Sequence, residues 1–381
     1  MCSGKISERI THVATLRNAL KALSTTLDLP FDIKLAALGG RSPERTEKAA
    51  KQWGFESYTT DWRRLVDNPQ VHVLVNLTGN SMHAEPSIAA LQLGKHVLCE
   101  KPLATSNADV AAMVDAARSS TGINACGYNY RFVPAVRLAK QLVSSGRLGP
   151  LRDVNIAYEQ DWASKLPARQ GWRFDNPVEG SAVYDLSHII DLFRWIVDEP
   201  DAVTATVGSL RPVSENTGVS DAIIGADPED SYTALVRTDG GLLATFRASR
   251  IATGRKGRQR LEITGEHGSL VWNMEDLNRL QVFIEDQDNT ISGYRDVLVT
   301  EMDHPFMNYW FAPGHIIGWD HTVIHQWISV LAGITQFDPS IPADFATFED
   351  GARAVSVADS IRQSAREQRW IKVGASQSVR A

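Results

Sequence analysis

Cysteine is scarce in this sequence, with Cys2, Cys99 and Cys126 the only three among 381 residues. None of them belongs to a C-x-x-C pair, so the spacing argues against a zinc site and against a framework of disulfide bonds. We expect no bound metal ion. Few cysteines are also typical of proteins from a reducing compartment, and we expect this protein in the cytoplasm.

Long apolar runs are missing as well. No stretch approaches the ~18 consecutive apolar residues of a membrane-spanning helix, and the N-terminus has no apolar segment of the length found in signal peptides. A basic excess is absent too, because 39 lysines and arginines are outnumbered by 45 aspartates and glutamates, for a formal net charge of −6. We therefore expect neither a membrane nor a nucleic acid among the partners.

One short basic run is the exception to this balance. The run Arg255 to Arg260 holds four cations and leads straight into a strand-like segment. This position favours a solvated hairpin loop over a phosphate or subunit contact.

The remaining composition is that of an ordinary globular protein, 43% hydrophobic and 22% charged, and the length predicts two or three domains. From about residue 10 to 126, strand and helix patterns alternate with short connections. This predicts an α/β fold, a doubly wound parallel sheet of the Rossmann type, over residues 1–126. The expected strands are 33–38, 71–77, 95–99 and 123–128, and the expected helices are 10–23, 43–53, 83–93 and 107–119.

The pattern changes near residue 127. Longer segments of alternating polar and apolar residues follow, joined by turn sequences such as Thr238-Asp239-Gly240-Gly241, as in antiparallel hairpins. We expect an α+β domain with an open, largely antiparallel sheet over residues 127–343. Residues 344–381 should form a helix at 345–366 that packs back on one of the domains, and a polar tail. The expected strands are 151–160, 202–210, 231–237, 241–250, 259–265, 268–273 and 279–284, with helices at 134–145 and 186–197.

Glycine is missing where a dinucleotide-binding fold needs it. The fingerprint G-x-G-x-x-G lies between a first strand and a helix, but only Met1–Ser7 precedes the helical pattern of residues 10–23. Gly4 can serve as the second or third glycine at a cofactor, and no residues remain for the first strand, which is central in this fold. Its loss would leave unpaired backbone and apolar surface on both neighbouring strands. We hypothesise that the sequence is a shortened form, an idea that a native protein of the same mass as this sequence would refute.

An acidic residue is missing from the end of the strand expected over 33–38. In NAD-binding Rossmann folds such a residue holds the ribose 2′-hydroxyl, whereas this strand ends in Gly39-Gly40-Arg41-Ser42. A guanidinium beside a hydroxyl suits a 2′-phosphate, which favours NADP as the cofactor, with NAD as the alternative. Arg41 can equally be a solvated loop charge, and Ser42 an N-cap.

Polar residues also follow the next expected strand, over 71–77. Thr78, Gly79, Asn80 and His83 stand at the sheet edge where ligands of open α/β sheets bind. Backbone N–H groups of this turn and helix start would face a cofactor. A capped helix start explains the same residues without a ligand.

The strand expected over 95–99 ends in Glu100-Lys101-Pro102. Pro102 restricts Lys101 to an extended backbone, which would aim the lysine side chain. Its ammonium could then hydrogen-bond the cofactor ribose and a substrate oxygen. A surface lysine is the alternative interpretation.

The motif Cys99-Glu100-Lys101-Pro102-Leu103-Ala104 resembles the signature of the Gfo/Idh/MocA family of oxidoreductases. The preceding helix and strand, His83 to Val97, are similar to that family too, and Asn129 to Ala135 resembles the segment that opens its second domain. Three further segments resemble the levoglucosan-dehydrogenase-like branch, with inositol-dehydrogenase-like enzymes as relatives. These segments are Gln160–Trp162, Gly171–Phe174 and Pro313–Trp319. The resemblance extends from about residue 30 to 373.

The resemblance implies an NAD(P)-dependent enzyme that oxidises a secondary hydroxyl of a sugar or polyol, or reduces the matching ketone. Its catalytic residues would be Lys101, Asp185 and His188. His188 would be the general acid/base, and Asp185 would bind a neighbouring hydroxyl or tune His188. The two stand three positions apart where the family has four, although both spacings share a helix face. The alternative is that His188 only caps or packs its helix.

The resemblance also implies contacts around the reacting centre. The expected cofactor-binding residues are Gly4, Arg41, Ser42, Thr78, Gly79, Asn80, His83, Glu100, Lys101, Asn129, Trp172 and Arg173. The expected substrate-binding residues are Lys101, Tyr130, Gln160, Trp162, Arg173, Asp185 and His188. A tryptophan with polar neighbours suits a sugar ring, although core packing explains a tryptophan as well.

Two rival functions remain open. A non-catalytic regulator of the same fold could bind a dinucleotide or a sugar, and a dihydrodiol or imine could replace the sugar as substrate. We expect a homodimer or homotetramer, because an exposed apolar sheet face needs cover. His321 and His325 stand four apart in a helical stretch without a third ligand candidate, and we interpret them as structural or interface residues.

Overall fold

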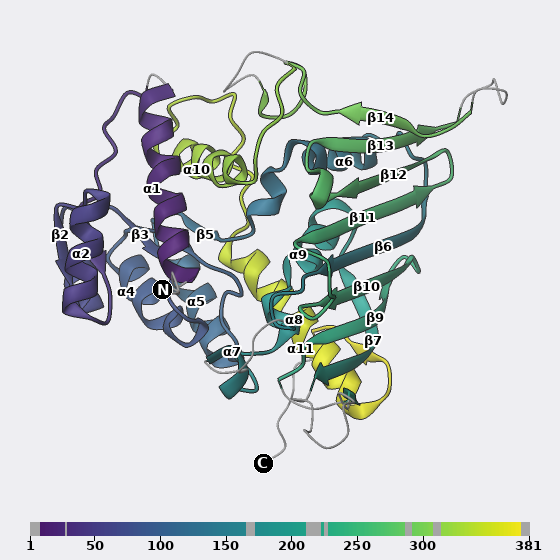
Figure 1. Ribbon diagram of the computed structural model, residues 1–381, viewed down its shortest axis with the longest axis horizontal. Coiled ribbons are helices and arrows are strands. Elements are labelled where there is room, and N and C mark those ends of the chain that lie inside the picture. The colour runs from purple at the N-terminus through teal and green to yellow at the C-terminus, as the bar shows by residue number, and fades with distance from the viewer. Residues whose placement is uncertain are drawn as a thin grey trace. The chain divides into compact units, whose positions relative to one another are not determined.

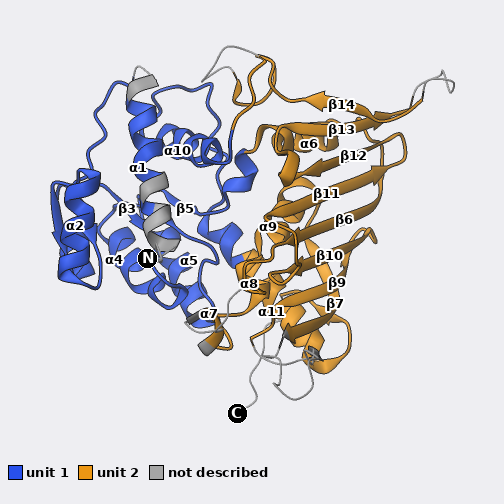
Figure 2. Ribbon diagram, in the orientation of Figure 1, with its two compact units in different colours: residues 1–132, 318–352 blue, residues 133–317, 353–381 orange. Residues whose placement is uncertain are grey.

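The computed structural model describes residues 8–26, 29–164, 172–210, 222–224, 228–285, 292–307 and 314–374. The chain forms two compact units (Figure 2). Unit 1 contains Met1–Phe132 and Gly318–Ala352, and unit 2 contains Val133–Ile317 and Arg353–Ala381. The sequence-based domain limits at 126 and 343 are therefore wrong in detail, because the chain returns to unit 1 after residue 317. Gly4 lies outside the described residues.

Unit 1 carries the parallel strands and their covering helices (Figure 1). The strands are β1 (Ala37–Gly39), β2 (Ser57–Thr59), β3 (Val73–Asn76), β4 (His96–Cys99) and β5 (Asn124–Cys126). The helices before residue 132 are α1 (Glu8–Thr26), α2 (Pro43–Trp53), α3 (Trp62–Asp67), α4 (Ala84–Gln92) and α5 (Asn107–Ser119), with 3₁₀ turns η1 (Asn80–Met82) and η2 (Asn129–Phe132). All strand pairs of this unit are parallel, as the alternating pattern predicts.

The sheet of unit 1 is split in two. Among the described residues, β1 pairs only with β2, while β3, β4 and β5 form a separate sheet. The sides of β1 and β3 that face away from β2 and β4 therefore have no strand partner in this part of the chain. Leu38 and Val75 are only half-buried, although each lies in a short apolar strand. This part of the chain therefore leaves a gap in the unit 1 sheet.

Residues after 317 complete unit 1. Helix α10 (Asp320–Thr335) packs against α1, and Leu16, Leu20, Ile324 and Ile328 on these helices are buried. The backbone N–H of Cys126 donates to the carbonyl of Ala346 at 2.7 Å. This apolar packing is the reason that residues 318–352 belong with the first unit.

Unit 2 is an open sheet with helices against it (Figure 1). The described residues form ten strands in the order β14-β13-β12-β11-β6-β10-β9-β7-β15, with β8 on β7. They are β6 (Leu151–Glu159), β7 (Pro200–Leu210), β8 (Ala222–Ile224), β9 (Ser231–Thr238), β10 (Leu243–Ser249), β11 (Arg258–Gly265), β12 (Gly268–Asn273), β13 (Arg279–Ile284), β14 (Arg295–Leu298) and β15 (Ile371–Lys372). All pairs are antiparallel except β6 with β10, which confirms a largely antiparallel sheet.

The helices of unit 2 pack against strands of its sheet. They are α6 (Pro134–Ser144), α7 (Trp172–Asp175), α8 (Ala182–Asp185), α9 (His188–Ile196) and α11 (Phe348–Glu367), which begins in unit 1. Buried residues alternate with exposed ones along β9 and with half-buried ones along β11, so each strand buries one set of side chains. The structure adds elements that we did not predict, among them the short helices α3, α7 and α8 and the edge strands β2 and β14. The two strands bury almost no side chain and leave little apolar pattern in the sequence.

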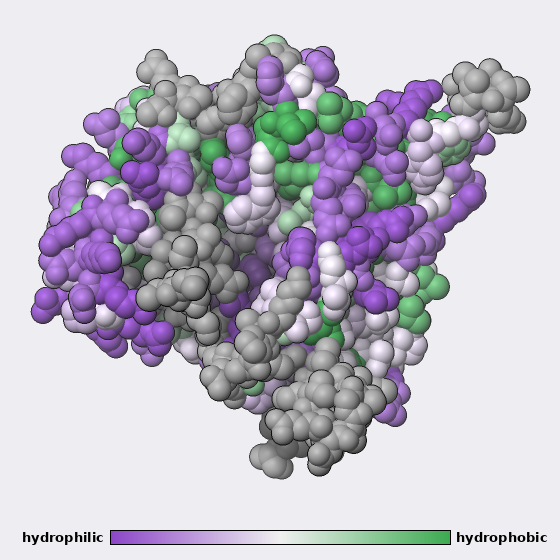
Figure 3. Space-filling view, in the orientation of Figure 1, coloured by the Kyte–Doolittle hydropathy of each residue, from purple (hydrophilic) through white to green (hydrophobic). Residues whose placement is uncertain are grey.

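The basic run of residues 255–260 lies in and before β11, where each cation meets a carboxylate of the chain. Arg255 pairs with Glu275 at 3.3 Å, Lys256 with Asp161 at 2.9 Å and Arg260 with Glu262 at 3.0 Å. Arg258 pairs with Glu159. The run is therefore neutralised within unit 2. The expected hairpin is wrong, because β6 lies between β10 and β11 in the sheet. Figure 3 shows many hydrophilic residues over the strands of this unit.

No helix in the described parts of the chain is both long and apolar enough to cross a bilayer.

Candidate active site

The carboxyl end of β1 carries Gly39-Gly40-Arg41-Ser42. A Cβ atom at Gly40 would lie 2.3 Å from Thr46 Oγ1, so the turn into α2 needs glycine there. Ser42 is the N-cap of α2, and its Oγ accepts a hydrogen bond from the Arg45 N–H at 3.4 Å. The Arg41 side chain is exposed and makes no hydrogen bond or ion pair with any described residue. Ser42 thus has a capping role, while the Arg41 cation is available to an anion.

The turn after β3 is organised by a buried amide that the sequence analysis missed. Asn76 Nδ2 donates to the carbonyls of Met82 and His83, both at 3.1 Å. Its Oδ1 accepts from the Thr78 hydroxyl at 2.6 Å and from the Thr78 N–H at 3.2 Å. The sequence did contain a signal for this role, because Asn76 is an amide at the end of an otherwise apolar strand. Asn76 holds the turn that contains Thr78, Gly79 and Asn80.

His83 joins this turn to the segment after β4. Its ring is buried, with Nδ1 2.9 Å from the Pro102 carbonyl oxygen and Nε2 3.3 Å from that of Thr78. Burial lowers the pKa of the His83 imidazole, so the neutral ring is favoured. The shorter contact assigns its proton to Nδ1. Both nitrogens therefore lie against carbonyls of the chain, and this geometry gives His83 a positioning role next to Lys101-Pro102.

Lys101 is the second residue after β4 and is half-buried. Its peptide bond to Pro102 is cis. The backbone N–H of Lys101 donates to Glu100 Oε2 at 3.1 Å. A Cβ atom at Gly127 would lie 3.1 Å from the same oxygen, so the glycine after β5 makes room for the Glu100 side chain. The strand ends β4 and β5 together support the backbone of Lys101.

Asn129 and Tyr130 lie in η2 and are both buried. Asn129 Nδ2 donates to Thr322 Oγ1 at 3.0 Å, which ties η2 to the start of α10. The amide that we expected at the cofactor thus has a partner within unit 1.

These strand ends fit a dinucleotide at the carboxyl edge of the unit 1 sheet. They present the Arg41 cation, the backbone of the Gly79 turn and the Lys101 ammonium, donors that suit phosphate and ribose oxygens.

In unit 2, alternate side chains at the end of β6 form a chain of hydrogen bonds. Trp162 Nε1 donates to Gln160 Oε1 at 3.2 Å, and Gln160 Nε2 donates to the Tyr158 hydroxyl at 3.1 Å. The Tyr158 ring meets the His188 ring edge to face, with centroids 6.0 Å apart. Tyr158 was missed by sequence reasoning, although positions 158, 160 and 162 share the alternation of a strand. These two hydrogen bonds and the ring contact link Trp162 to His188.

Asp185 and His188 occupy the ends of two helices, which corrects the single helix expected over 186–197. Asp185 is the last residue of α8, and His188 is the first of α9, with Ser187 as its N-cap. The backbone breaks here because Leu186 and Ser187 close separate turns on Ala182 and Tyr184. His188 is 7% exposed, so its ring reaches the protein surface at a small area only.

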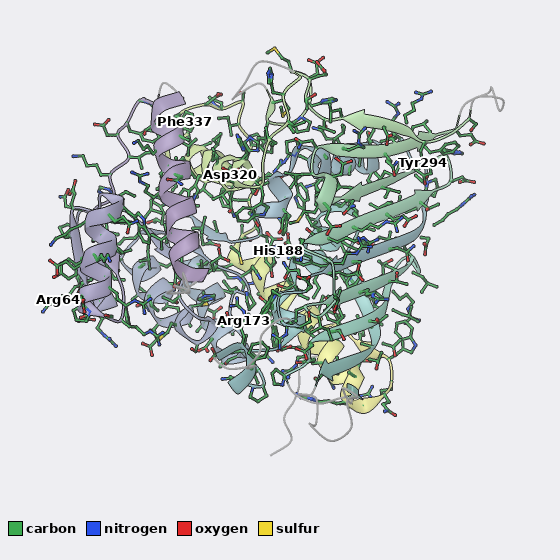
Figure 4. All side chains as sticks on the ribbon, viewed as in Figure 1. Arg64, Arg173, His188, Tyr294, Asp320 and Phe337 are labelled. Atoms are coloured by element: carbon green, nitrogen blue, oxygen red, sulfur yellow. The ribbon has the colours of Figure 1, made fainter. Side chains whose placement is uncertain are left out.

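Arg173, which Figure 4 labels together with His188, contacts two other candidates. Its Nη2 lies 3.7 Å from Asp185 Oδ1, and its guanidinium stands over the Trp162 ring at 5.6 Å. Trp172 belongs to the same short helix, α7, but its side chain lies outside the described residues. Trp162, Arg173 and Asp185 thus form one cluster, called the sugar cluster below.

The sugar cluster has the chemistry of a carbohydrate site. An indole supplies an apolar face, a carboxylate accepts hydroxyl protons and a guanidinium donates hydrogen bonds. Its connection to His188 through Gln160 and Tyr158 places all five unit 2 candidates with described side chains in one network. Lys101, Arg41 and the Thr78 turn belong to unit 1.

His321 and His325 make hydrogen bonds within unit 1. His321 Nδ1 accepts from the Gly318 N–H at 3.3 Å. The buried His325 ring lies 3.2 Å from the Phe132 carbonyl. Both contacts agree with structural roles.

Two family models match this chain. The model of the oxidoreductase family with an NAD-binding Rossmann fold matches residues 4–128. The model of the GFO/IDH/MocA C-terminal domain matches residues 136–271. The matches fall in the two parts of the chain that carry Lys101 and His188.

Similar proteins of described activity include two sugar enzymes. Levoglucosan dehydrogenase of Pseudarthrobacter phenanthrenivorans is 33% identical over 349 residues, 87% of each chain. The 1,5-anhydro-D-fructose reductase of Ensifer adhaerens is 30% identical over 241 residues, which cover 62% of this chain and 68% of the reductase. A solved structure of levoglucosan dehydrogenase in complex with NADH and levoglucosan aligns with a TM-score of 0.86 at 31% identity, covering 94% of this chain and 96% of that one.

Proposed function

Because the chain belongs to the GFO/IDH/MocA family of oxidoreductases, whose N-terminal domain is an NAD-binding Rossmann fold, we propose that it is a sugar or polyol dehydrogenase. It exchanges a hydride between a nicotinamide cofactor and a secondary hydroxyl, or the matching ketone. The observation that carries this proposal is the sugar cluster of Trp162, Arg173 and Asp185, connected to the imidazole of His188. The activities of levoglucosan dehydrogenase and the anhydrofructose reductase support the substrate class.

Each residue has a role in this proposal. When bound, the nicotinamide supplies or takes up the hydride. The imidazole of His188 takes the proton from the substrate hydroxyl oxygen or returns it. Asp185 accepts a hydrogen bond from a neighbouring hydroxyl, held in place by Arg173, and the Trp162 ring covers an apolar face of the sugar. Lys101 hydrogen-bonds the cofactor ribose and the substrate oxygen.

A panel of sugars and polyols, assayed by the absorbance of the reduced nicotinamide, tests this function. We expect turnover with at least one pyranose or polyol, and a fall in kcat of about 10²–10⁴-fold for His188→Asn, because general acid/base catalysis contributes that much. His321→Asn is the matched control, since His321 lies in unit 1, where its imidazole accepts a backbone N–H.

A second candidate function is a non-catalytic regulator that binds a dinucleotide or a sugar. The helix break between Asp185 and His188 and the gap in the unit 1 sheet favour it. Binding of a sugar and a nicotinamide without turnover, in the full chain, would select the regulator over the dehydrogenase.

The proposal includes a preference for NADP over NAD. It rests on the exposed Arg41 cation and on the absence of an acidic residue at the end of β1, Ala37–Gly39. We expect calorimetric titration to show tighter binding of NADPH than of NADH, and Arg41→Ala to weaken NADPH binding by roughly tenfold, the worth of one charge-assisted hydrogen bond. NADH binding should stay within twofold. Equal affinities of the unaltered protein for both cofactors would contradict the preference.

A further inference from the structure

Arg250 is a completely buried cation directly after β10. Its guanidinium and the carboxylate of Asp230 are both 0% exposed, and Nε donates to Asp230 Oδ1 at 2.8 Å. Removing two charges from water costs several kcal/mol per ion before pairing. A buried ion pair is therefore weak evidence of a role in stability alone, and the remaining donors of Arg250 show what the pair is connected to.

Those donors bind the segment that leads into the candidate catalytic helices. Nη1 donates to the Gly180 carbonyl at 2.7 Å and Nη2 to the Arg173 carbonyl at 3.3 Å. The two carbonyls can share one guanidinium because the segment folds back on itself. A Cβ atom at Gly180 would lie only 2.4 Å from the Arg173 carbonyl oxygen, so this approach requires glycine.

The same guanidinium also lies over two aromatic rings. It lies 4.9 Å from the centre of the Phe174 ring and 5.5 Å from that of Trp162. The two rings are 6.0 Å apart. In addition, the Arg250 carbonyl accepts the N–H of Ala163, next to Trp162, at 3.0 Å. One side chain thus touches every segment that carries a member of the sugar cluster.

We propose that Arg250 is the positioning residue of the sugar cluster, holding Trp162 and the Arg173–Asp185 pair in the arrangement that recognises the substrate. This inference rests on the dehydrogenase function proposed above. Lysine could not replace it, because only the planar guanidinium offers donors to Asp230, Gly180 and Arg173 together with a stacking face. Asp230 keeps the buried charge compensated.

The chain contains a matched control in a neighbouring buried ion pair. Arg362 Nε donates to Glu229 Oε1 at 2.6 Å and Nη2 donates to the Pro177 carbonyl at 3.1 Å. Its guanidinium also stands 5.5 Å from the Tyr184 ring. These contacts join Arg362 to Glu229, Pro177 and Tyr184, which are not members of the sugar cluster. Arg362→Lys therefore removes the same kind of buried guanidinium with two hydrogen bonds and leaves the contacts of Arg250 with the sugar cluster in place.

The experiment compares Arg250→Lys with Arg362→Lys in the full chain by two readouts. Hydrogen exchange at the amides of Gly180 and Asp185 reports the segment itself. We expect about tenfold faster exchange in Arg250→Lys, from a loss of roughly 1.4 kcal/mol of local stability, and a change below threefold in Arg362→Lys. In steady-state kinetics, we expect Arg250→Lys to raise KM for the sugar at least about tenfold, with KM for the nicotinamide cofactor within twofold.

The outcomes separate the two proposals. If both lysine variants change exchange and sugar KM equally, Arg250 is an ordinary structural residue and the inference is overturned. If the unaltered protein turns over no sugar, the proposed dehydrogenase fails, and the exchange comparison still decides whether Arg250 holds the segment. If Arg250→Lys does not fold, Phe174→Leu removes one ring contact without touching the ion pair. It should then raise sugar KM in the same direction, and an unchanged KM would count against the inference.

Discussion

Burial favours the neutral form of two histidines of unit 1. His96 Nδ1 accepts the N–H of Ile123 at 2.9 Å, which links β4 to β5 and requires an unprotonated nitrogen. His83 faces two carbonyls from a fully buried position. Burial lowers the pKa of both rings below the value of about 6.5 that an unfolded histidine has. Unit 1 therefore carries an acid-sensitive link next to Lys101.

The first prediction concerns pH. Because the unfolded chain takes up protons at higher pH than the folded chain, stability should be unaffected by these groups above about pH 6.5 and should fall below it, down to the lowered folded pKa. Thermal unfolding measured from pH 8 to about pH 5 tests this. His96→Asn, whose side-chain oxygen can still accept the Ile123 N–H, should flatten the decline. A decline of equal slope in this variant would exclude His96 as a source.

At the scale of elements, the described residues leave a gap in the unit 1 sheet, because β1 and β3 each have one side without a strand partner there. The parallel strands on both sides of the gap keep their apolar residues, and Leu38 and Val75 are half-buried. A strand in that position would satisfy two rows of backbone groups and cover both side chains. The gap also adjoins the strand ends that carry Arg41 and the Thr78 turn.

We predict that an N-terminal extension rich in valine and isoleucine, about eight residues long, raises the stability of unit 1. Full burial of each large apolar side chain contributes about 1.5–3 kcal/mol, so several degrees in Tm are expected. An extension of equal length made of glycine and serine is the control. Equal melting temperatures for the two extended proteins would show that the gap does not accept a strand.

At the scale of the whole molecule, the outward side of the unit 2 sheet is mixed in character. Arg247 and Arg258 pair there with Glu159, while Leu235 and Leu243 are 48% and 55% exposed on the adjacent strands β9 and β10. The face is less apolar than the sequence suggested. A homodimer or homotetramer remains our prediction, with the two leucines as the contact.

Sedimentation over a range of concentrations tests this contact. We expect Leu243→Glu to raise the dissociation constant of the oligomer at least about tenfold and so to favour smaller species, because a charge placed in a subunit contact is costly to desolvate. Leu93→Glu, in unit 1, is the matched control, since Leu93 is similarly exposed at 58%. The same distribution for both variants would place the contact elsewhere.

Local sequence determined the elements and the family of this protein. Strand alternation and helix periodicity depend on neighbouring residues, so the bounds of α2, α5, β12 and β13 follow from the sequence alone. The motif around Lys101 led to the oxidoreductase family, which the comparisons confirm.

Only the tertiary structure decided which distant residues meet. The return of α10 to unit 1, the alignment of Tyr158 with His188, and the convergence of Arg173, Gly180 and Trp162 on Arg250 join segments tens of residues apart. The break between Asp185 and His188 was likewise invisible, because a spacing of three fits a continuous helix as well as two short ones. Such contacts depend on which side chains are buried together and on how buried charges pair. A local pattern of residues cannot predict either of these.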